Sequence, residues 1–288
     1  MNKYLIAALI LLAGTGTALA QKTAAAPAAA PRIASAATAQ PVTISAAKSL
    51  QWDRKAKTYT AIKDVIAKQG NVTIHSDTLT AHYLNDRKGG TSITTLDADG
   101  HVTIDAPPYK AVGEHAVYTV KTGDAVLTGK SLEITSDDGS VLTAKDRIEY
   151  NNRNRTMTAF GSPEAFKSPD TLTADVMSAT FTKNAAGKMT AQTISAQGHV
   201  VIKTLSETIT GDSSVYNTTT QKAVLTGNVR IWQGKNWLQG TRADIDMKTG
   251  ISRLSEKGDG TMGGRVTGVF YPQSRNNKPA ADLKTKTP

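Results

Sequence analysis

The sequence predicts an all-β protein assembled from repeated strand pairs. A glycine followed by an apolar-x-apolar pair recurs along the chain, apolar and polar residues alternate with a period of two, and helical periodicity is almost absent. Such alternation, bounded by Gly and Asn, is typical of strands with one buried face. The clearest copy runs from Lys222 to Leu254, where two alternating runs flank a turn at residues 233–236.

The first 20 residues have the pattern of a secretory signal peptide. Lys3 precedes a short apolar run at residues 5–12, and small residues end at Ala20. A charged start, a short apolar core and an A-x-A site predict cleavage after Ala20. The run is too short to span a bilayer, although a permanent N-terminal anchor is the alternative. The chain has no cysteine, which excludes the bacterial lipoprotein route. We therefore expect a mature protein outside the cytoplasm.

Two further segments flank the repeats. Residues 21–41 are rich in Ala and Pro, a composition that buries too little surface to fold and predicts a disordered tether. Residues 273–288 are polar and basic and predict a disordered tail. The domain that carries the repeats is expected to span residues 42–272.

The charge balance favours an anionic partner. The formal net charge is +10, and outside the cytoplasm such a protein meets anionic lipid or polysaccharide rather than nucleic acid. A generally basic surface without a specific partner is the alternative reading of the same charge.

Six glycine-led units define the repeat. After most of them comes a second strand that ends in tyrosine, as at Tyr83, Tyr118, Tyr150 and Tyr216. One unit of about two strands cannot bury its apolar face alone, whereas stacked units form a continuous one. The six glycines are Gly70, Gly100, Gly129, Gly161, Gly198 and Gly227.

The repeat places an aliphatic stripe on one face of the stack. In G-x-V-x-I the Val and the Ile are two residues apart, so both side chains point to the same side of a strand. The stripe contains Val72, Ile74, Val102, Ile104, Val200, Ile202, Val229 and Ile231. This stripe is either a surface for an apolar ligand or the packed core of a solenoid.

Motifs for catalysis or metal binding do not form a consistent set. Ser45 and Lys48 match S-x-x-K, but the motif follows the Ala/Pro-rich tether, and the chain lacks the Ser-Asp-Asn element of penicillin-recognising enzymes. The five histidines form no zinc motif. The acid pairs Asp97/Asp99 and Asp137/Asp138 lie in stretches that resemble turns, where aspartate is common. The alternative is that they are the catalytic acids of a polysaccharide lyase or hydrolase. We expect no catalytic residue, no metal and no cofactor.

The ordered motifs resemble the OstA-like lipopolysaccharide transport family. The residues that carry the resemblance are the signal peptide, GNVTIHSDTLTAHY at residues 70–83, AVLTGNVRI at residues 223–231, and the repeat between Pro41 and Leu254. The resemblance implies an open, twisted, V-shaped and solenoid-like β-jellyroll of antiparallel strands. It also implies that lipid A acyl chains lie inside the V, in the periplasm of a Gram-negative cell.

The same resemblance implies protein partners. Family members associate head to tail with copies of themselves, with an LptC-like inner-membrane protein and with an LptD-like outer-membrane protein, and so bridge the two membranes during outer-membrane assembly. This chain departs from the pattern in its tether and basic tail. A second departure lies at residues 161–181, where Pro163 and Pro169 interrupt the repeat and predict a sheet edge or a bulge.

The lipid-binding residues follow from alternation along the strands, so a slip by one residue would reverse them. The predicted set is Val102, Ile104, Leu132, Ile134, Val141, Ile148, Val200, Ile202, Val229 and Ile231. Cations expected near the mouth of the groove are Arg54, Lys55, Lys57, Lys110, Arg147 and Arg230. They are either contacts for lipid phosphates or ordinary solvated side chains. The alternatives to a lipid carrier are a secreted structural β-solenoid or adhesin scaffold with a dry core, and a β-helical polysaccharide enzyme.

Overall fold

The structure is a computed structural model that describes residues 41–85, 90–183, 189–256 and 265–271. The predicted signal peptide, all but the last residue of the tether, and the predicted tail lie outside the described residues. Twenty strands account for the fold. They are β1 (Thr43–Ser45), β2 (Ser49–Asp53), β3 (Thr58–Gln69), β4 (Val72–Asn85), β5 (Thr91–Ala106), β6 (Tyr109–Thr119), β7 (Asp124–Thr128), β8 (Leu132–Ser136), β9 (Val141–Ala144), β10 (Arg147–Asn151), β11 (Thr156–Phe160), β12 (Glu164–Lys167), β13 (Asp170–Thr173), β14 (Val176–Lys183), β15 (Met189–Lys203), β16 (Thr208–Asn217), β17 (Lys222–Gln233), β18 (Asn236–Asp246), β19 (Ile251–Ser255) and β20 (Thr267–Val269).

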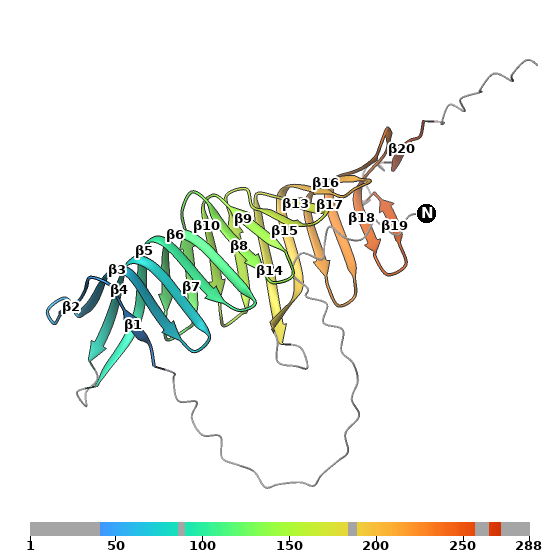
Figure 1. The fold of residues 1–288 in the computed structure, drawn as a ribbon. Helices are drawn as coiled ribbons and strands as arrows, with labels where there is room; N and C mark the ends of the chain where they lie inside the picture. The colour runs from blue at the N-terminus through green and yellow to red at the C-terminus, as the bar shows by residue number, and fades with distance from the viewer. Residues whose placement is uncertain (1–40, 86–89, 184–188, 257–264, 272–288) are drawn as a thin grey trace, which may run out of the picture.

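All the strand pairings of the described residues are antiparallel and belong to one sheet. The strands stack along a single long axis from β1 and β2 at one end to β19 and β20 at the other (Figure 1). The prediction of an all-β chain built from antiparallel strand pairs is therefore confirmed.

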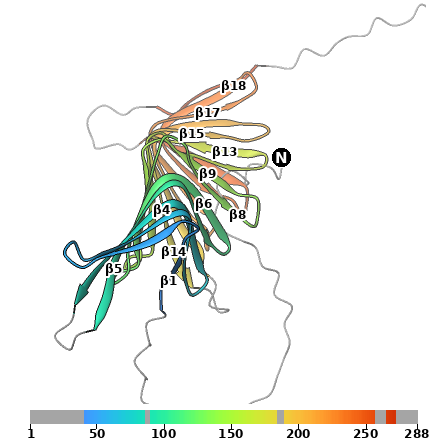
Figure 2. The same ribbon diagram turned by 60° about the vertical axis from the view of Figure 1, so that its left-hand side comes forward.

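The sheet has two arms that meet along one edge, which we call the corner (Figure 2). The long strands β3–β6 and β15–β18 each give one half to either arm, and register shifts mark the bend in most of them. Arm 1 also contains β2, β7, β10, β11, β14 and β19. Arm 2 also contains β1, β8, β9, β12, β13 and β20.

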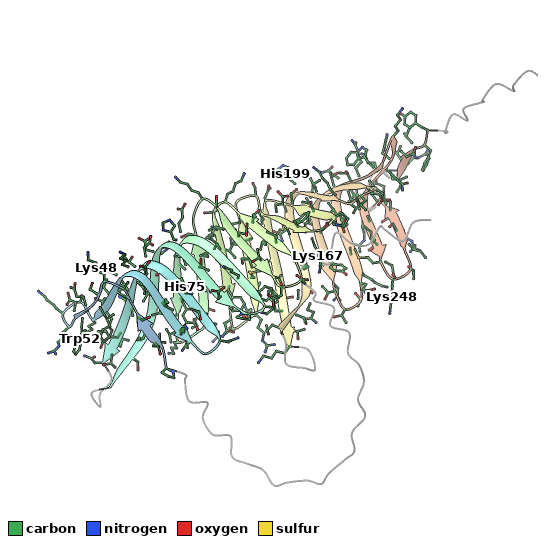
Figure 3. The ribbon with its side chains drawn as sticks, in the orientation of Figure 1. Lys48, Trp52, His75, Lys167, His199 and Lys248 are labelled. Atoms are coloured by element: carbon green, nitrogen blue, oxygen red, sulfur yellow. The ribbon has the colours of Figure 1, made fainter. Side chains whose placement is uncertain are left out.

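Left-handed backbone conformations make the corner. At the bend of β15, Gly198 has a φ of 74° and His199 a φ of 45°. The Asp175 carboxylate packs against Gly198, and its Oδ2 lies 2.8 Å from His199 Nδ1. His199 projects from the outer side of the corner, at the upper edge of the body in Figure 3. The same arrangement recurs as Gly100, His101 and Asp77, and as Gly227, Asn228 and Asp212.

The aspartate at one bend also affects the ionisation of its histidine. The hydrogen bond and the negative charge of Asp77 raise the pKa of His101. Because φ values near +60° are accessible mainly to Gly, Asn, Asp and His, the residue types at the bend follow from its backbone.

A spine of fully buried side chains runs along the inside of the corner. Each member is at most 1% exposed. The valines directly follow a residue with positive φ at a bend, and the leucine follows Gly129 by three residues. The members are Val65, Val102, Leu132, Val200 and Val229. The valine of the G-x-V-x-I repeat therefore joins the arms, and the isoleucine two residues later lies farther out on arm 2.

Two stretches of the chain depart from the regular repeat. Gly70 has a φ of 62° but lies in the tight turn between β3 and β4, because Gln69 pairs with Val72. The bend of β3 is instead made by Lys63 and Asp64, which have positive φ without glycine. Of the two features predicted for residues 161–181, the sheet edge is wrong, since β12 pairs with both β9 and β13. A bulge is present, as a register shift at Thr180/Phe181 against β15.

Within the described ranges, the structure holds no helix that is both long enough and apolar enough to cross a membrane.

Candidate functional site

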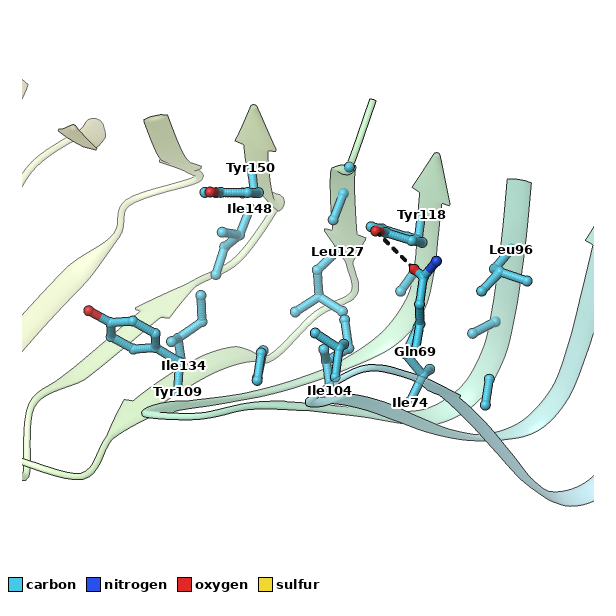
Figure 4. Close-up of a pocket in the computed structure, with 18 of the residues that line it drawn as sticks. Gln69, Ile74, Leu96, Ile104, Tyr109, Tyr118, Leu127, Ile134, Ile148 and Tyr150 are labelled. Atoms are coloured by element: carbon cyan, nitrogen blue, oxygen red, sulfur yellow. Dashed lines mark hydrogen bonds between the residues drawn. The ribbon is translucent and has the colours of Figure 1, made fainter. Parts of the chain in front are cut away.

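An apolar groove lies between the inner faces of the two arms. Its cavity has a volume of about 360 Å³ and extends from Val42, just before β1, to Met189 at the start of β15, through the N-terminal part of the stack. Figure 4 shows Ile74, Ile104 and Ile134 on one wall and Leu127 and Ile148 on the other. The groove is therefore lined by both arms, not by a single strand pair.

Cross-strand neighbours build each wall as a continuous row. On arm 2, Ile74 pairs with Ile104, Ile104 pairs with Ala111, and Ala111 pairs with Ile134. Because directly opposed residues of antiparallel strands point to the same face, the isoleucines form one stripe across four strands. This is the stripe that the spacing of the repeat predicts.

The wall on arm 1 mixes aliphatic and tyrosine side chains. Leu127 pairs with Ile148, and Leu96 pairs with Tyr118 in the next row toward the strand ends. Tyr118 Oη donates a hydrogen bond of 3.4 Å to Gln69 Oε1 on the opposite arm. Burial raises the pKa of Tyr118 and of Tyr150, so both hydroxyls stay protonated at physiological pH and are able to donate a hydrogen bond.

A second, much smaller cavity of about 30 Å³ follows the first along the stack. Tyr109, Ile134 and Met157 line both cavities. The groove therefore narrows where β6, β8 and β11 contribute these side chains.

The structure divides nine of the ten predicted lipid-binding residues into three groups. Ile104, Ile134 and Ile148 line the larger cavity. The spine holds Val102, Leu132, Val200 and Val229, whose side chains are packed at the corner. Ile202 and Ile231 lie on the inner face of arm 2 in the C-terminal part, where both are buried.

For Val141, the prediction that its side chain lies on the inner face is wrong. It borders the smaller cavity, but the register pairs it with Thr135 and Phe166, which lie on the outer face of arm 2. Leu142, its neighbour, pairs with Ile134 and Ala165 and is buried. The inner position of this strand is therefore occupied by Leu142. The prediction failed because Val141 and Leu142 are both apolar, so alternation alone does not show which of them faces inward.

The aromatic side chains of the site were not predicted from the sequence. Tyr109, Tyr118, Tyr150 and Phe181 all line the larger cavity. A signal for two of them was present, because Tyr118 and Tyr150 end the second strand of their repeat units. Tyr109 and Phe181 have no counterpart in the repeat.

Three of the predicted phosphate-binding cations have protein partners. The Arg54 guanidinium lies over the Trp52 ring, 4.3 Å from its centroid. Arg147 donates to Glu149 Oε1 at 2.6 Å and to Asp146 Oδ2 at 3.0 Å. Arg230 donates to Gln239 Oε1 at 2.6 Å. The contacts of Arg147 and Arg230 hold their guanidinium groups on the outer face of the sheet.

One acid of each candidate catalytic pair has a basic partner. Asp97 Oδ1 lies 2.8 Å from His115 Nε2, and Lys167 Nζ donates to Asp138 Oδ2 at 2.6 Å. Burial raises the pKa of Asp138, but the hydrogen bonds from Lys167 and Ser140 and the charge of Lys167 outweigh it and hold the pKa at about 2. Among the residues that the structure describes, no three His, Cys, Asp or Glu side chains converge as metal ligands.

Comparison with known proteins gives the family. A family model described as "LptA/(LptD N-terminal domain) LPS transport protein" matches residues 44–154 and 143–251. A protein of Rhizobium meliloti (strain 1021), named only as uncharacterized, is 28% identical over 146 residues, which are 49% of this chain and 75% of that protein.

Among solved structures, a similar chain is LptH of Pseudomonas aeruginosa, described as the LptA homologous periplasmic component of a lipopolysaccharide transport device. It is 13% identical, and the match covers 81% of this chain and 96% of that chain with a TM-score of 0.21. The family assignment depends on the sequence instead. The two matches to the family model together span residues 44–251 of the 288 residues. The chain therefore belongs to the LptA/LptD N-terminal domain family of lipopolysaccharide transport proteins.

Proposed function

We propose that this protein is a non-enzymatic, periplasmic carrier of the LptA type, which shields the acyl chains of lipid A between its two arms. In this proposal the arms form an open, V-shaped jellyroll, and the acyl chains enter along the side away from the corner. The observation that carries the proposal is the apolar groove, with an isoleucine row on arm 2 that faces Leu127 and Ile148 on arm 1.

The chemistry of the groove suits a lipid tail. Each CH₂ group moved out of water contributes about 0.8 kcal/mol, so a chain of about twelve contributes about 10 kcal/mol. Aliphatic walls supply this stabilisation without directional bonds, which allows a chain to slide. A scaffold with a dry core, by contrast, would fill the space between its faces with side chains to near-crystalline density.

The cavity is small for a lipid that has several acyl chains. A cavity of about 360 Å³ is near the lower end of the roughly 300–1,000 Å³ range of small-molecule sites. A lipid with several acyl chains needs more space, so loading requires either wider separation of the arms or occupation of the groove beyond the present cavity.

The ends of the stack are the proposed contacts with protein partners. At one end β1 and β2 each pair with β3, and at the other β19 and β20 each pair with β18. Strand edges of this kind accept a further strand from another chain. We assign them to head-to-tail copies, to an LptC-like inner-membrane protein and to an LptD-like outer-membrane protein, with cleavage after Ala20 releasing the mature chain into the periplasm.

A binding measurement with purified protein tests the lipid site. We expect Ile134→Glu to weaken binding of fluorescently labelled lipopolysaccharide about tenfold or more, because an ionised carboxylate in an apolar groove loses its hydration without a partner. Glu133→Gln is the matched control, since Glu133 is exposed on the outer face of the same strand, and its affinity should equal that of the wild type. Equal affinity of a folded Ile134→Glu variant would refute the lipid site.

A further inference from the structure

Two aromatic rings meet across the groove. Tyr109 begins β6 on arm 2, and Phe181 lies in β14 on arm 1. Their ring centroids are 6.3 Å apart with the planes at 74°, an edge-to-face arrangement. Aromatic pairs favour this geometry because the positive edge of one ring faces the negative face of the other. Since β6 and β14 are not strand neighbours, the contact joins the arms through side chains.

The pair stands at the point where the groove narrows. Both rings line the cavity of about 360 Å³. Tyr109 also lines the cavity of about 30 Å³ that follows it, together with Ile134 and Met157. An acyl chain that moves from the N-terminal part of the groove toward the C-terminal part must therefore pass these rings.

The backbone under each ring is fixed, whereas the rings are held mainly by packing. Tyr109 pairs with Ala106 and Ser136 in the sheet, and the Pro108 carbonyl accepts a hydrogen bond of 3.1 Å from Asp137 N–H. Phe181 N–H donates to the Arg155 carbonyl at 2.8 Å. Because each ring turns about only two side-chain torsions, the rings can separate while the strand pairing stays intact.

We propose that Tyr109 and Phe181 form a gate, which stops acyl chains in the N-terminal part of the groove until the two rings separate. The gate divides the groove into two stations, one on each side of the rings. This inference rests on the proposed lipid-carrier function. In it, Tyr109 and Phe181 control how far an acyl chain moves along the groove.

The test measures where the lipid lies. A photo-crosslinking side chain replaces either Ile104, on the near side of the gate, or Ile231, on the inner face of β17 beyond it. The full mature chain is incubated with lipopolysaccharide and irradiated, and the ratio of the Ile231 adduct to the Ile104 adduct is recorded. Tyr109→Ala and Phe181→Ala should each raise this ratio about fivefold, the factor that corresponds to loss of one edge-to-face contact.

Three controls separate a gate from a structural effect. Tyr109→Phe keeps the ring and should give the wild-type ratio. Phe166→Ala removes an aromatic side chain that is 40% exposed on the outer face of arm 2, and it should also leave the ratio unchanged. The chain has no cysteine, so Tyr109→Cys with Phe181→Cys can be joined by a reducible bismaleimide, which should abolish the Ile231 adduct until reductant is added.

Each outcome decides one question. An unchanged ratio in both alanine variants, or an Ile231 adduct that persists in the joined double-cysteine variant, would overturn the gate while the Ile104 adduct still supports the carrier. Absence of the Ile104 adduct in the wild-type chain would overturn the carrier function itself.

Discussion

Replacing Gly198 with alanine should destabilise the fold by about 3 kcal/mol. Gly198 has a φ of 74°, a conformation that is strained for alanine. An added Cβ would also overlap the Asp175 side chain, whose Cγ would lie 2.7 Å away and whose Cβ 2.9 Å. Since the overlap includes Asp175 Cβ as well as its carboxylate, a rotation of the side chain does not relieve it. The whole residue must move, and its contact with His199 would be lost. The free energy of unfolding from urea denaturation measures the effect.

Gly234 supplies the matched control. It also has a positive φ, of 60°, but no atom lies within 4 Å of the position of an added Cβ. Gly234→Ala should therefore lower the free energy of unfolding only through backbone strain, by about 1 kcal/mol. In an Asp175→Ala background the cost of Gly198→Ala should fall toward the same value. Equal costs for Gly198→Ala and Gly234→Ala in the wild-type background would show that the packing of aspartate against glycine does not define the corner.

Replacing Leu132 with alanine should cost about 2–5 kcal/mol. Leu132 is 1% exposed at the corner, and its Cδ2 lies close to Gly113, where Leu127 also packs. Removal of three methyl or methine groups there leaves a void that β-strands fixed on both sides cannot close. Such a loss is a large fraction of the roughly 5–15 kcal/mol that stabilises most domains. Thermal and urea unfolding of the purified variant give the value.

The control for Leu132 is Leu84, which has the same chemistry but is 58% exposed. Leu84→Ala should change the free energy of unfolding by no more than about 0.5 kcal/mol. A similar small change for Leu132→Ala would mean that the spine does not join the arms. The comparison also separates two roles that lie two residues apart, because Leu132 stabilises the corner and Ile134 lines the groove.

The repeat predicted the inner stripe well because its signal is local. In G-x-V-x-I the Val and the Ile share a face in any strand, and the structure places Val102 with Ile104, and Val229 with Ile231, on the inner side. The sequence did not tell which glycine makes a corner. Gly70 precedes the same Asn-Val pair as Gly227, yet it lies in a two-residue turn.

The physical reason is that a left-handed conformation is needed both in turns and at corners. A glycine satisfies either one, and Lys63 and Asp64 show that a corner also forms without glycine. What distinguishes the corner glycines is an acidic residue that packs against them, such as Asp212 against Gly227. That contact involves another strand and is not visible in the spacing of the repeat.

The candidate site was predicted in part for a similar reason. Its aliphatic residues follow strand alternation, whereas Tyr109 and Phe181 become part of the site only because the two arms face each other. Long-range geometry of this kind leaves no periodic trace in the sequence. The gate that we propose could therefore be found only after the arms were placed.

The most direct test of lipid transport through the groove is photo-crosslinking in living Gram-negative cells. A photo-crosslinking side chain is placed at Ile134, which lines the groove, and separately at Glu133, which is exposed on the outer face. After irradiation, a lipopolysaccharide adduct is expected at Ile134 and not at Glu133. An adduct at Glu133 alone, or at neither position while the protein is folded and abundant, would contradict the carrier function proposed for the inner face.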